Sequence, residues 1–141
     1  MIRIGTKKDA LALASISKDS LHPAWKEADF LAAMENAQAR VFVFGDEPQG
    51  YGVFYFAADE GEIPSIAVKK EFRKQGAGKE LLEAMVSFSK EAGVKRIFLE
   101  VRGSNETAIS FYKGNGFSEV GKRPKFYDNP TEDGLILEKT F

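Results

Sequence analysis

Hydrophobic positions recur with helical spacing in some segments of the chain and alternate with polar positions in others. Three successive alternating segments are rich in β-branched and aromatic residues, which predicts three antiparallel strands joined by short turns. The predicted strands cover residues 2–5, 40–45, 50–58, 60–68, 95–102, 117–127 and 134–141, and the predicted helices cover residues 6–16, 23–36, 79–92 and 105–116. The expected fold is a single α/β (α+β) domain over residues 1–141, with a mixed, mostly antiparallel sheet of six to seven strands and about four helices.

Local signals sharpen some of these boundaries. Thr6 followed by Asp9 three residues later resembles a capping box at the start of the first helix. Pro23 suits the first turn of the second helix. Pro64 cannot donate a backbone hydrogen bond, so we expect an edge, a bulge or a strand start within residues 60–68. Residues 128–134 are polar and predict a loop between the last two strands.

Composition narrows the possible functions. A content of 43% hydrophobic and 12% aromatic residues is typical of a globular protein. The formal charge of −1 predicts no broad basic surface for nucleic acid. It contains no cysteine and one histidine, His22, which we expect in a loop or at a helix start, so a catalytic triad or a metal centre is not expected. No segment approaches the ~18 apolar residues of a membrane span. We therefore expect a cytoplasmic protein without a membrane partner.

Residues 73–85, "RKQGAGKELLEAM", place two glycines among basic side chains directly before a helix. The P-loop pattern fails because Arg73 stands at its first glycine and Glu80 follows Lys79. The dinucleotide-binding fingerprint fails because Leu81 stands at its third glycine. A more general anion site remains, because bare backbone and a helix N-terminus attract negative charge. The expected ligand carries a phosphate or pyrophosphate, although a turn with solvated lysines is the alternative.

A second set of candidate residues follows in "LEVRGSNETAISFYKGNGF", residues 99–117. Glu100 alternates with apolar neighbours on its strand, and burial would raise the pKa of its carboxyl group toward the range of a general base. Tyr112 lies on the apolar face of its helix and could donate a proton. From the residues alone, Glu100 could equally form an ion pair with Arg102 or Lys95. Tyr112 could be a core residue, and Asn105 could be only a helix N-cap.

Both segments resemble motifs of the GNAT superfamily of N-acetyltransferases, and the second is most similar to bacterial ribosomal-protein-alanine N-acetyltransferases. The resemblance implies acetyl-CoA as the co-substrate, no metal, Glu100 as general base and Tyr112 as general acid. It implies direct transfer of acetyl to the α-amino group of a protein N-terminus, such as that of a ribosomal protein. The implied acetyl-CoA contacts are Ile66, Ala67, Val68, Arg73, Lys74, Gln75, Gly76, Ala77, Gly78, Lys79 and Asn105.

The acceptor side departs from the family pattern, because Phe126 and Tyr127 replace a pair of tyrosines. Trp25, Arg123 and Tyr127 are candidate residues of the acceptor cleft. A small-molecule amine is therefore the alternative acceptor, and a non-catalytic acyl-CoA sensor is the alternative from another class. A nucleic-acid-binding domain built on the basic residues 69–74 agrees poorly with the neutral charge balance. The sequence is compatible with a monomer or a homodimer.

Overall fold

The computed structural model describes residues 1–21, 23–128 and 130–141, so the expectation for His22 lies outside the described residues. Seven strands form one sheet in the order β1-β2-β3-β4-β5-β7-β6. The strands are β1 (Ile2–Ile4), β2 (Ala39–Phe44), β3 (Gly50–Ala57), β4 (Glu60–Val68), β5 (Arg96–Arg102), β6 (Ser118–Tyr127) and β7 (Glu132–Thr140). The helices are α1 (Ala10–Ser20), α2 (Glu27–Glu35), α3 (Ala77–Ala92) and α4 (Glu106–Gly114), and the 3₁₀ turns are Lys7–Asp9 and Lys70–Phe72.

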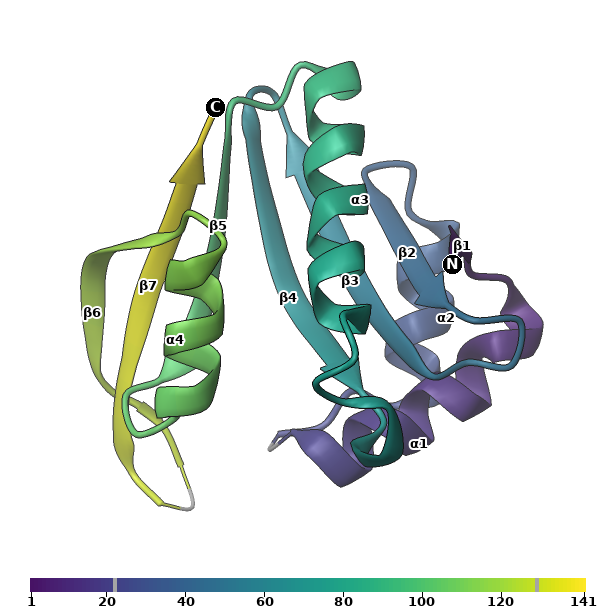
Figure 1. The fold of residues 1–141 in the computed structure, drawn as a ribbon, viewed down its shortest axis with the longest axis horizontal. Coiled ribbons are helices and arrows are strands. Elements are labelled where there is room, and N and C mark those ends of the chain that lie inside the picture. Colours follow the sequence, from purple (N-terminus) through teal and green to yellow (C-terminus); the bar gives the residue numbers. More distant parts are fainter. Residues whose placement is uncertain (22, 129) are drawn as a thin grey trace.

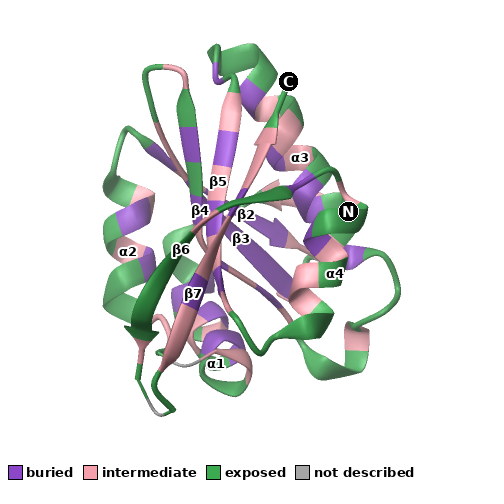
Figure 2. Cartoon of the chain, turned by 90° about the vertical axis from the view of Figure 1, so that its left-hand side faces the viewer, coloured by how far each residue is buried: buried purple, intermediate pink, exposed green. Residues whose placement is uncertain are grey.

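The sheet separates two hydrophobic clusters. Figure 2 shows α3 and α4 on one side of the strands and α2 on the other. The cluster under α3 and α4 contains Phe42, Phe54, Ile63, Leu81, Met85, Leu99, Tyr112 and Leu137. The cluster under α1 and α2 contains Leu13, Ile16, Phe30, Val41, Val43, Tyr51, Val53 and Ala67. Neighbouring strand residues thus point to opposite faces, as the alternation in the sequence predicts.

Among the strands of the described residues, only β4 and β5 run parallel, and the crossover between them contains α3. Three residue pairs connect them, from Glu60 with Arg96 to Glu62 with Phe98, and the strands then separate. Figure 1 shows them close together at one end and diverging toward their carboxyl ends. At this point β4 also bulges, because Val53 pairs with Ser65 whereas Tyr55 pairs with Glu62. Pro64 lies in that bulge, which is one of the three placements that its missing N–H predicted.

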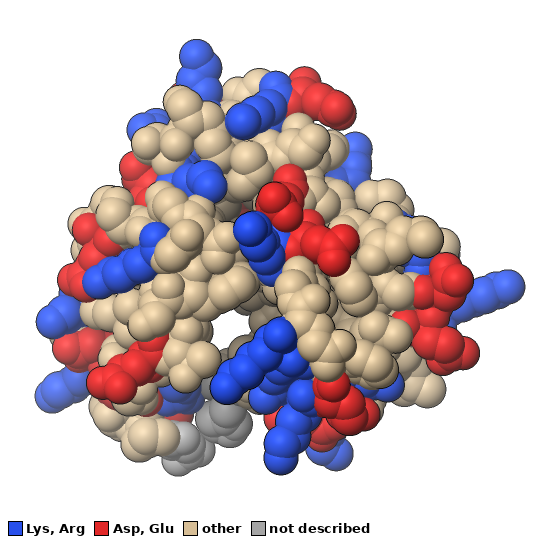
Figure 3. Space-filling view, viewed as in Figure 1, with Lys and Arg blue, Asp and Glu red and all other residues tan. Residues whose placement is uncertain are grey.

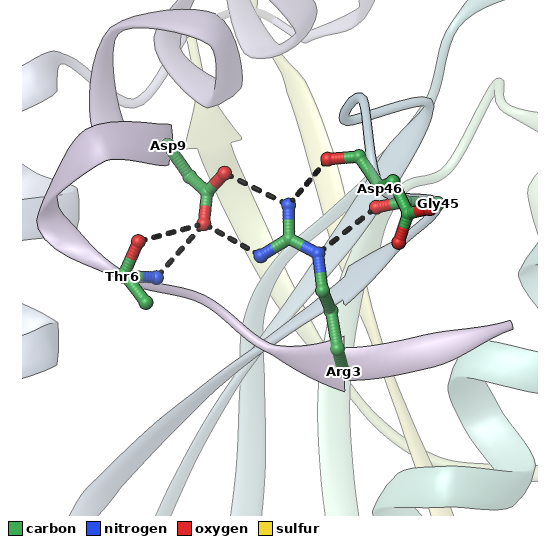
Figure 4. Close-up of polar contacts among 5 residues, drawn as sticks. All are labelled: Arg3, Thr6, Asp9, Gly45 and Asp46. Carbon is green, nitrogen blue, oxygen red and sulfur yellow. Dashed lines mark hydrogen bonds and ion pairs between the residues drawn. The ribbon is translucent and has the colours of Figure 1, made fainter.

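An ionic network joins β1 to its surroundings, as Figure 4 shows. The Arg3 guanidinium donates to both carboxylate oxygens of Asp9, at 2.8 and 2.9 Å, and to the backbone carbonyls of Gly45 and Asp46. Asp9 also accepts a hydrogen bond of 2.8 Å from the backbone N–H of Thr6. The predicted capping pair is therefore confirmed, and Arg3 extends it to the turn between β2 and β3.

Several predicted boundaries were wrong. The first helix continues four residues beyond Ile16, to Ser20. The second helix begins at Glu27, not at Pro23, because Lys26 is extended and its N–H donates to the Asp29 carboxylate. The last loop is shorter than predicted, since β7 already begins at Glu132.

Candidate active site

The divergence of β4 and β5 leaves backbone groups of β4 without a strand partner on one side. The Lys69 N–H donates to the Gln49 carbonyl, and hydrogen-bonded pairs alternate along an antiparallel ladder. Ala67, opposite Tyr51, therefore turns its peptide groups toward β3. Those of Ile66 and Val68 turn toward the gap. Of the three β4 residues predicted to contact acetyl-CoA, Ala67 is thus the one whose N–H and C=O both face β3, and its side chain is buried.

The gap is open in the folded chain. Figure 3 shows an opening between the part of the molecule that contains β4 and the part that contains β5. Lys and Arg side chains lie beside it at the N-terminal end of α3. Within the described ranges, the backbone N–H groups of residues 74–79 donate no hydrogen bond to protein, and the first recorded helical bond runs from Glu80 to Gly76. The first N–H groups of a helix have no partner within the helix, so this helix start attracts an anion. This is the segment in which the sequence predicts the pyrophosphate.

The two glycines of this segment serve different purposes. Gly76 is the N-cap of α3 and has a φ of 90°, a left-handed conformation that costs glycine little. A Cβ on Gly78 would lie 3.1 Å from Cζ of Phe111, so Gly78 allows α3 and α4 to approach each other. Lys74 also has a positive φ of 61°, although it carries a side chain. The close packing role of Gly78 was not anticipated from the sequence.

Two further residues predicted to bind acetyl-CoA have defined protein partners. Arg73 donates from Nε to the Val68 carbonyl at 2.9 Å and from Nη2 to the Ser20 hydroxyl at 3.0 Å. It thereby fastens the loop to the ends of β4 and α1. Asn105 is the N-cap of α4, and its Oδ1 accepts a hydrogen bond of 3.1 Å from Ala108. The N-cap interpretation of Asn105 is confirmed, while contact with CoA stays a prediction.

Glu100 lies on β5 at the edge of the gap. Its partner in an ion pair is Arg123 of β6, with 3.1 Å between Oε1 and Nε, whereas Arg102 pairs with Glu132. The pairing with Arg102 or Lys95 that the sequence left open is therefore replaced by one with a distant strand. The Oε2 atom is buried and has no hydrogen-bond partner within the part of the chain that the structure describes. Burial raises the pKa of Glu100, Arg123 opposes this shift, and the charge of Glu62 adds to it.

Tyr112 approaches the gap from the opposite face. It is 6% exposed and packs edge-on against Phe111 and Phe117 in the cluster under α3 and α4. Burial raises the pKa of its hydroxyl, and the phenols of Tyr51 and Tyr127 raise it further through their charge. Tyr51 belongs to the cluster under α1 and α2 and bonds to Ser65 at 2.7 Å. Tyr112 and Tyr51 therefore belong to the clusters on opposite faces of the sheet.

The candidate acceptor residues surround the Glu100 side of the gap. Tyr127 stacks on Arg102 at 4.6 Å, and burial and the nearby Glu100 charge raise the pKa of its phenol. Phe126 is 48% exposed, and the Arg123 guanidinium lies over the Phe126 ring at 5.3 Å from the ring centre. The aromatic pair thus divides into an inner tyrosine and an outer phenylalanine.

Trp25 lies farther along the same face, where its ring approaches Tyr55 at 6.3 Å. Burial raises the pKa of Tyr55, and the charges of Asp29 and Glu62 raise it further. Sequence reasoning missed Tyr55 and Glu62, because their side chains join this face only through the pairing of β3 with β4. The alternation along β3 and β4 was a usable signal, but the bulge at Pro64 shifts it by one residue.

Residues 1–21, 23–128 and 130–141 contain neither a cluster of metal-binding side chains nor a membrane-spanning helix. No group of three or more His, Cys, Asp or Glu side chains among them is arranged to hold a metal ion. No helix formed by them combines the length and apolar character needed to cross a membrane.

Comparison with known proteins identifies similar chains. Residues 10–117 match the model of the acetyltransferase (GNAT) family. The sequence is 31% identical over 116 residues to the ribosomal protein bS18-alanine N-acetyltransferase of Salmonella typhimurium, covering 80% of this chain and 78% of that protein. The structure matches the ribosomal-protein-S18-alanine N-acetyltransferase from Escherichia coli with a TM-score of 0.89 and 26% identity, over 99% of this chain and 92% of the other. Ard1 from Thermoplasma volcanium matches with a TM-score of 0.90 and 26% identity, over 99% and 96% of the two chains.

Proposed function

Since the chain belongs to the acetyltransferase (GNAT) family and is an acetyl-CoA-dependent N-acetyltransferase, we propose that its acceptor is the α-amino group of a protein N-terminus. The observation that carries the proposal is the gap between β4 and β5, which has free backbone donors along one side and a buried carboxylate oxygen on the other. The relatives named for ribosomal protein bS18-alanine acetylation support an acceptor of that type, a ribosomal protein with N-terminal alanine.

The donor would bind from the face of α3 and α4. The free N–H groups of residues 74–79 and the charge of Lys79 would hold the pyrophosphate. The pantetheine arm would run along β4, where the N–H of Ile66 or Val68 can donate to the thioester carbonyl and stabilise the oxyanion that forms there. Asn105 would contact the CoA arm through its amide nitrogen, because its Oδ1 is used as the helix cap.

The acceptor would enter from the face of Glu100. In the proposed reaction the neutral amine attacks the thioester carbonyl carbon, the nitrogen–carbon bond forms and the carbon–sulfur bond breaks. Glu100 takes the proton that the nitrogen loses, directly or through water, and Tyr112 gives a proton to the departing CoA thiolate. The raised pKa of Tyr112 keeps its hydroxyl protonated in the working range. Proton exchange with solvent then restores both side chains, and no acyl-enzyme forms.

The ionisation of the acceptor favours an α-amino group over a lysine side chain. An α-amino group has a pKa of about 7.7–8.0, so a useful fraction is neutral near pH 7, whereas lysine has a pKa of about 10.4. Small-molecule amines are the competing acceptors. A panel that includes short peptides with different first residues, amino acids, polyamines and aminoglycosides separates the two classes. Labelling of small amines alone would refute the proposed acceptor and leave the acetyl-CoA chemistry intact.

The proposed roles are tested by turnover of acetyl-CoA with Glu100→Gln and Tyr112→Phe. A general base or acid contributes about 10²- to 10⁴-fold to the rate, so each variant is expected to lose kcat on that scale. Glu119→Gln is a matched control, because Glu119 is an exposed carboxylate on β6. Thermal unfolding shows whether each variant remains folded. Wild-type rates in both Glu100→Gln and Tyr112→Phe would refute the mechanism.

A further inference from the structure

The two carboxylate oxygens of Glu100 differ in their hydrogen-bond partners. Arg123 donates to Oε1 at 3.1 Å, while Oε2 is buried and finds no hydrogen-bond partner among residues 1–21, 23–128 and 130–141. A buried carboxylate oxygen without a partner is costly, and such atoms in native structures call for an explanation. A donor that arrives with the substrate, an amine or its water, would satisfy the free oxygen. The fixed oxygen determines in which direction the free one points.

The surrounding strands hold Arg123 in a position from which it can fix Oε1 of Glu100. Arg123 precedes Pro124, which restricts its backbone to extended conformations. Its partner on β7 is Gly134, where a Cβ would approach ring atoms of Phe126 and Tyr127 to 3.2 Å. The missing side chain therefore lets the aromatic pair lie against β7. Phe126 then supports the Arg123 guanidinium from the outer side at 5.3 Å.

The charges around Glu100 come from four strands. Glu62 approaches from β4, Arg123 and Tyr127 belong to β6, and Arg102 with its partner Glu132 joins β5 to β7 beside Tyr127. Among these groups, Arg123 is the cation in an ion pair with Glu100. It opposes the effects of burial and of Glu62, both of which raise the pKa of that carboxyl group. Arg123 therefore affects both the direction of the carboxylate and the pH at which it is charged.

We propose that Arg123 is a positioning residue of the acceptor site, which holds Oε1 of Glu100 so that Oε2 receives the proton of the acceptor amine. This role rests on the proposed function of Glu100 as the base. Arg123 itself acts through Glu100 and does not touch the reacting atoms. The paired cation also keeps the carboxylate ionised at pH values where a buried base would otherwise be protonated.

The first test compares kcat/KM across pH for Arg123→Gln, Arg123→Lys and Lys122→Gln. Misplacement of a catalytic group by about 1 Å can cost up to 10²-fold, so Arg123→Gln is expected to lose about 10-fold. The rate falls as Glu100 is protonated, and removal of the cation raises the pKa of Glu100, so the acid limb moves to higher pH. Arg123→Lys retains the charge and should restore the limb with a smaller loss of rate.

Lys122→Gln is the matched control, because it removes a neighbouring charge from the same strand on the opposite face. It should leave both the rate and the acid limb unchanged. An Arg123→Gln variant that behaves like Lys122→Gln in both respects would overturn the proposal. A loss of rate without movement of the acid limb would overturn it as well, because a structural effect alone would produce that result.

The second test is a double-mutant cycle with Glu100→Gln. If Arg123 acts through Glu100, then Arg123→Gln has no further effect on kcat/KM in the Glu100→Gln background. Full additivity of the two losses would overturn the positioning role. The cycle also separates the two proposals. A fully active Glu100→Gln variant refutes the proposed base, whereas an inactive Glu100→Gln with an unaffected Arg123→Gln refutes only the role of Arg123.

Discussion

Replacement of Asp9 by asparagine tests the ionic network that fastens β1. The Asp9 carboxylate is 10% exposed and accepts two hydrogen bonds from Arg3, one from the Thr6 N–H and a longer one from the Thr6 hydroxyl. It has no other basic partner among the described residues. Asparagine keeps the shape but retains one acceptor oxygen, and its NH₂ group would face the donors of Arg3. Arg3 would then keep its two bonds to the carbonyls of Gly45 and Asp46.

The expected loss follows from these contacts. Hydrogen bonds to charged groups contribute about 1.5–3 kcal/mol each, and loss of one partner of a fully buried pair costs about 3–5 kcal/mol. Arg3 is 30% exposed, so water compensates part of the loss. We expect Asp9→Asn to lower the free energy of unfolding by about 2–3 kcal/mol. For a domain of this size that corresponds to a decrease of about 6–9 °C in Tm.

The stabilisation of the fold by the Asp9 carboxylate is expected to decrease as the pH falls. Its hydrogen bonds with Arg3 lower the pKa of Asp9 below the unfolded value of about 3.9. The stabilisation is therefore complete above that value and is lost as the pH falls through the folded pKa. Chemical denaturation at several pH values should show wild type and Asp9→Asn converging in acid. Asp46→Asn is the control, since Arg3 binds the backbone carbonyl of Asp46. Equal stability of Asp9→Asn and Asp46→Asn at pH 7 would refute the reasoning.

Two further predictions concern glycines whose neighbours are fixed. Gly61→Ala would place a Cβ 2.4 Å from Cζ of the fully buried Phe54, so denaturation should show a loss of about 1–3 kcal/mol, whereas Gly114→Ala meets nothing within 4 Å and should be neutral or stabilising. Equal effects of the two substitutions would contradict this packing argument. Gly78→Val should push Phe111 and α4 away from α3 and raise KM for acetyl-CoA several-fold. The additional substitution Phe111→Ala should recover part of that loss, and an unchanged KM in Gly78→Val would show that the spacing of α3 and α4 is not critical.

The sequence predicts the fold well where local signals decide it. The bounds of β4 at residues 60–68 are as predicted, because hydrophobic alternation and flanking turn residues agree there. The start of α2 was missed because a tertiary contact, the hydrogen bond from the Trp25 N–H to the Ser17 hydroxyl at 2.8 Å, helps hold the preceding segment extended. The contact with Ser17 leaves no signal beside the helix start, whereas the bond from the Lys26 N–H to Asp29 is local and was overlooked.

In the candidate site, too, some features follow from local sequence and others only from tertiary contacts. The glycine segment and the pair Glu100 and Tyr112 can be found from motifs, because each motif is continuous in sequence. The ion pair joins two residues 23 positions apart, Glu100 and Arg123, and depends on the strand order β5-β7-β6, which the sequence pattern does not specify. The gap beside Glu100 likewise depends on the divergence of β4 and β5, which the sequence pattern does not specify.

The most direct test of the central claim is the position of the acetyl group on a peptide product. The purified protein is incubated with acetyl-CoA and a peptide that begins with alanine and contains an internal lysine, and the product is sequenced by tandem mass spectrometry. The account predicts acetylation of the N-terminal α-amino group and no product when that group is blocked. Acetylation of the lysine alone, or labelling of free small amines but of no peptide, would contradict it.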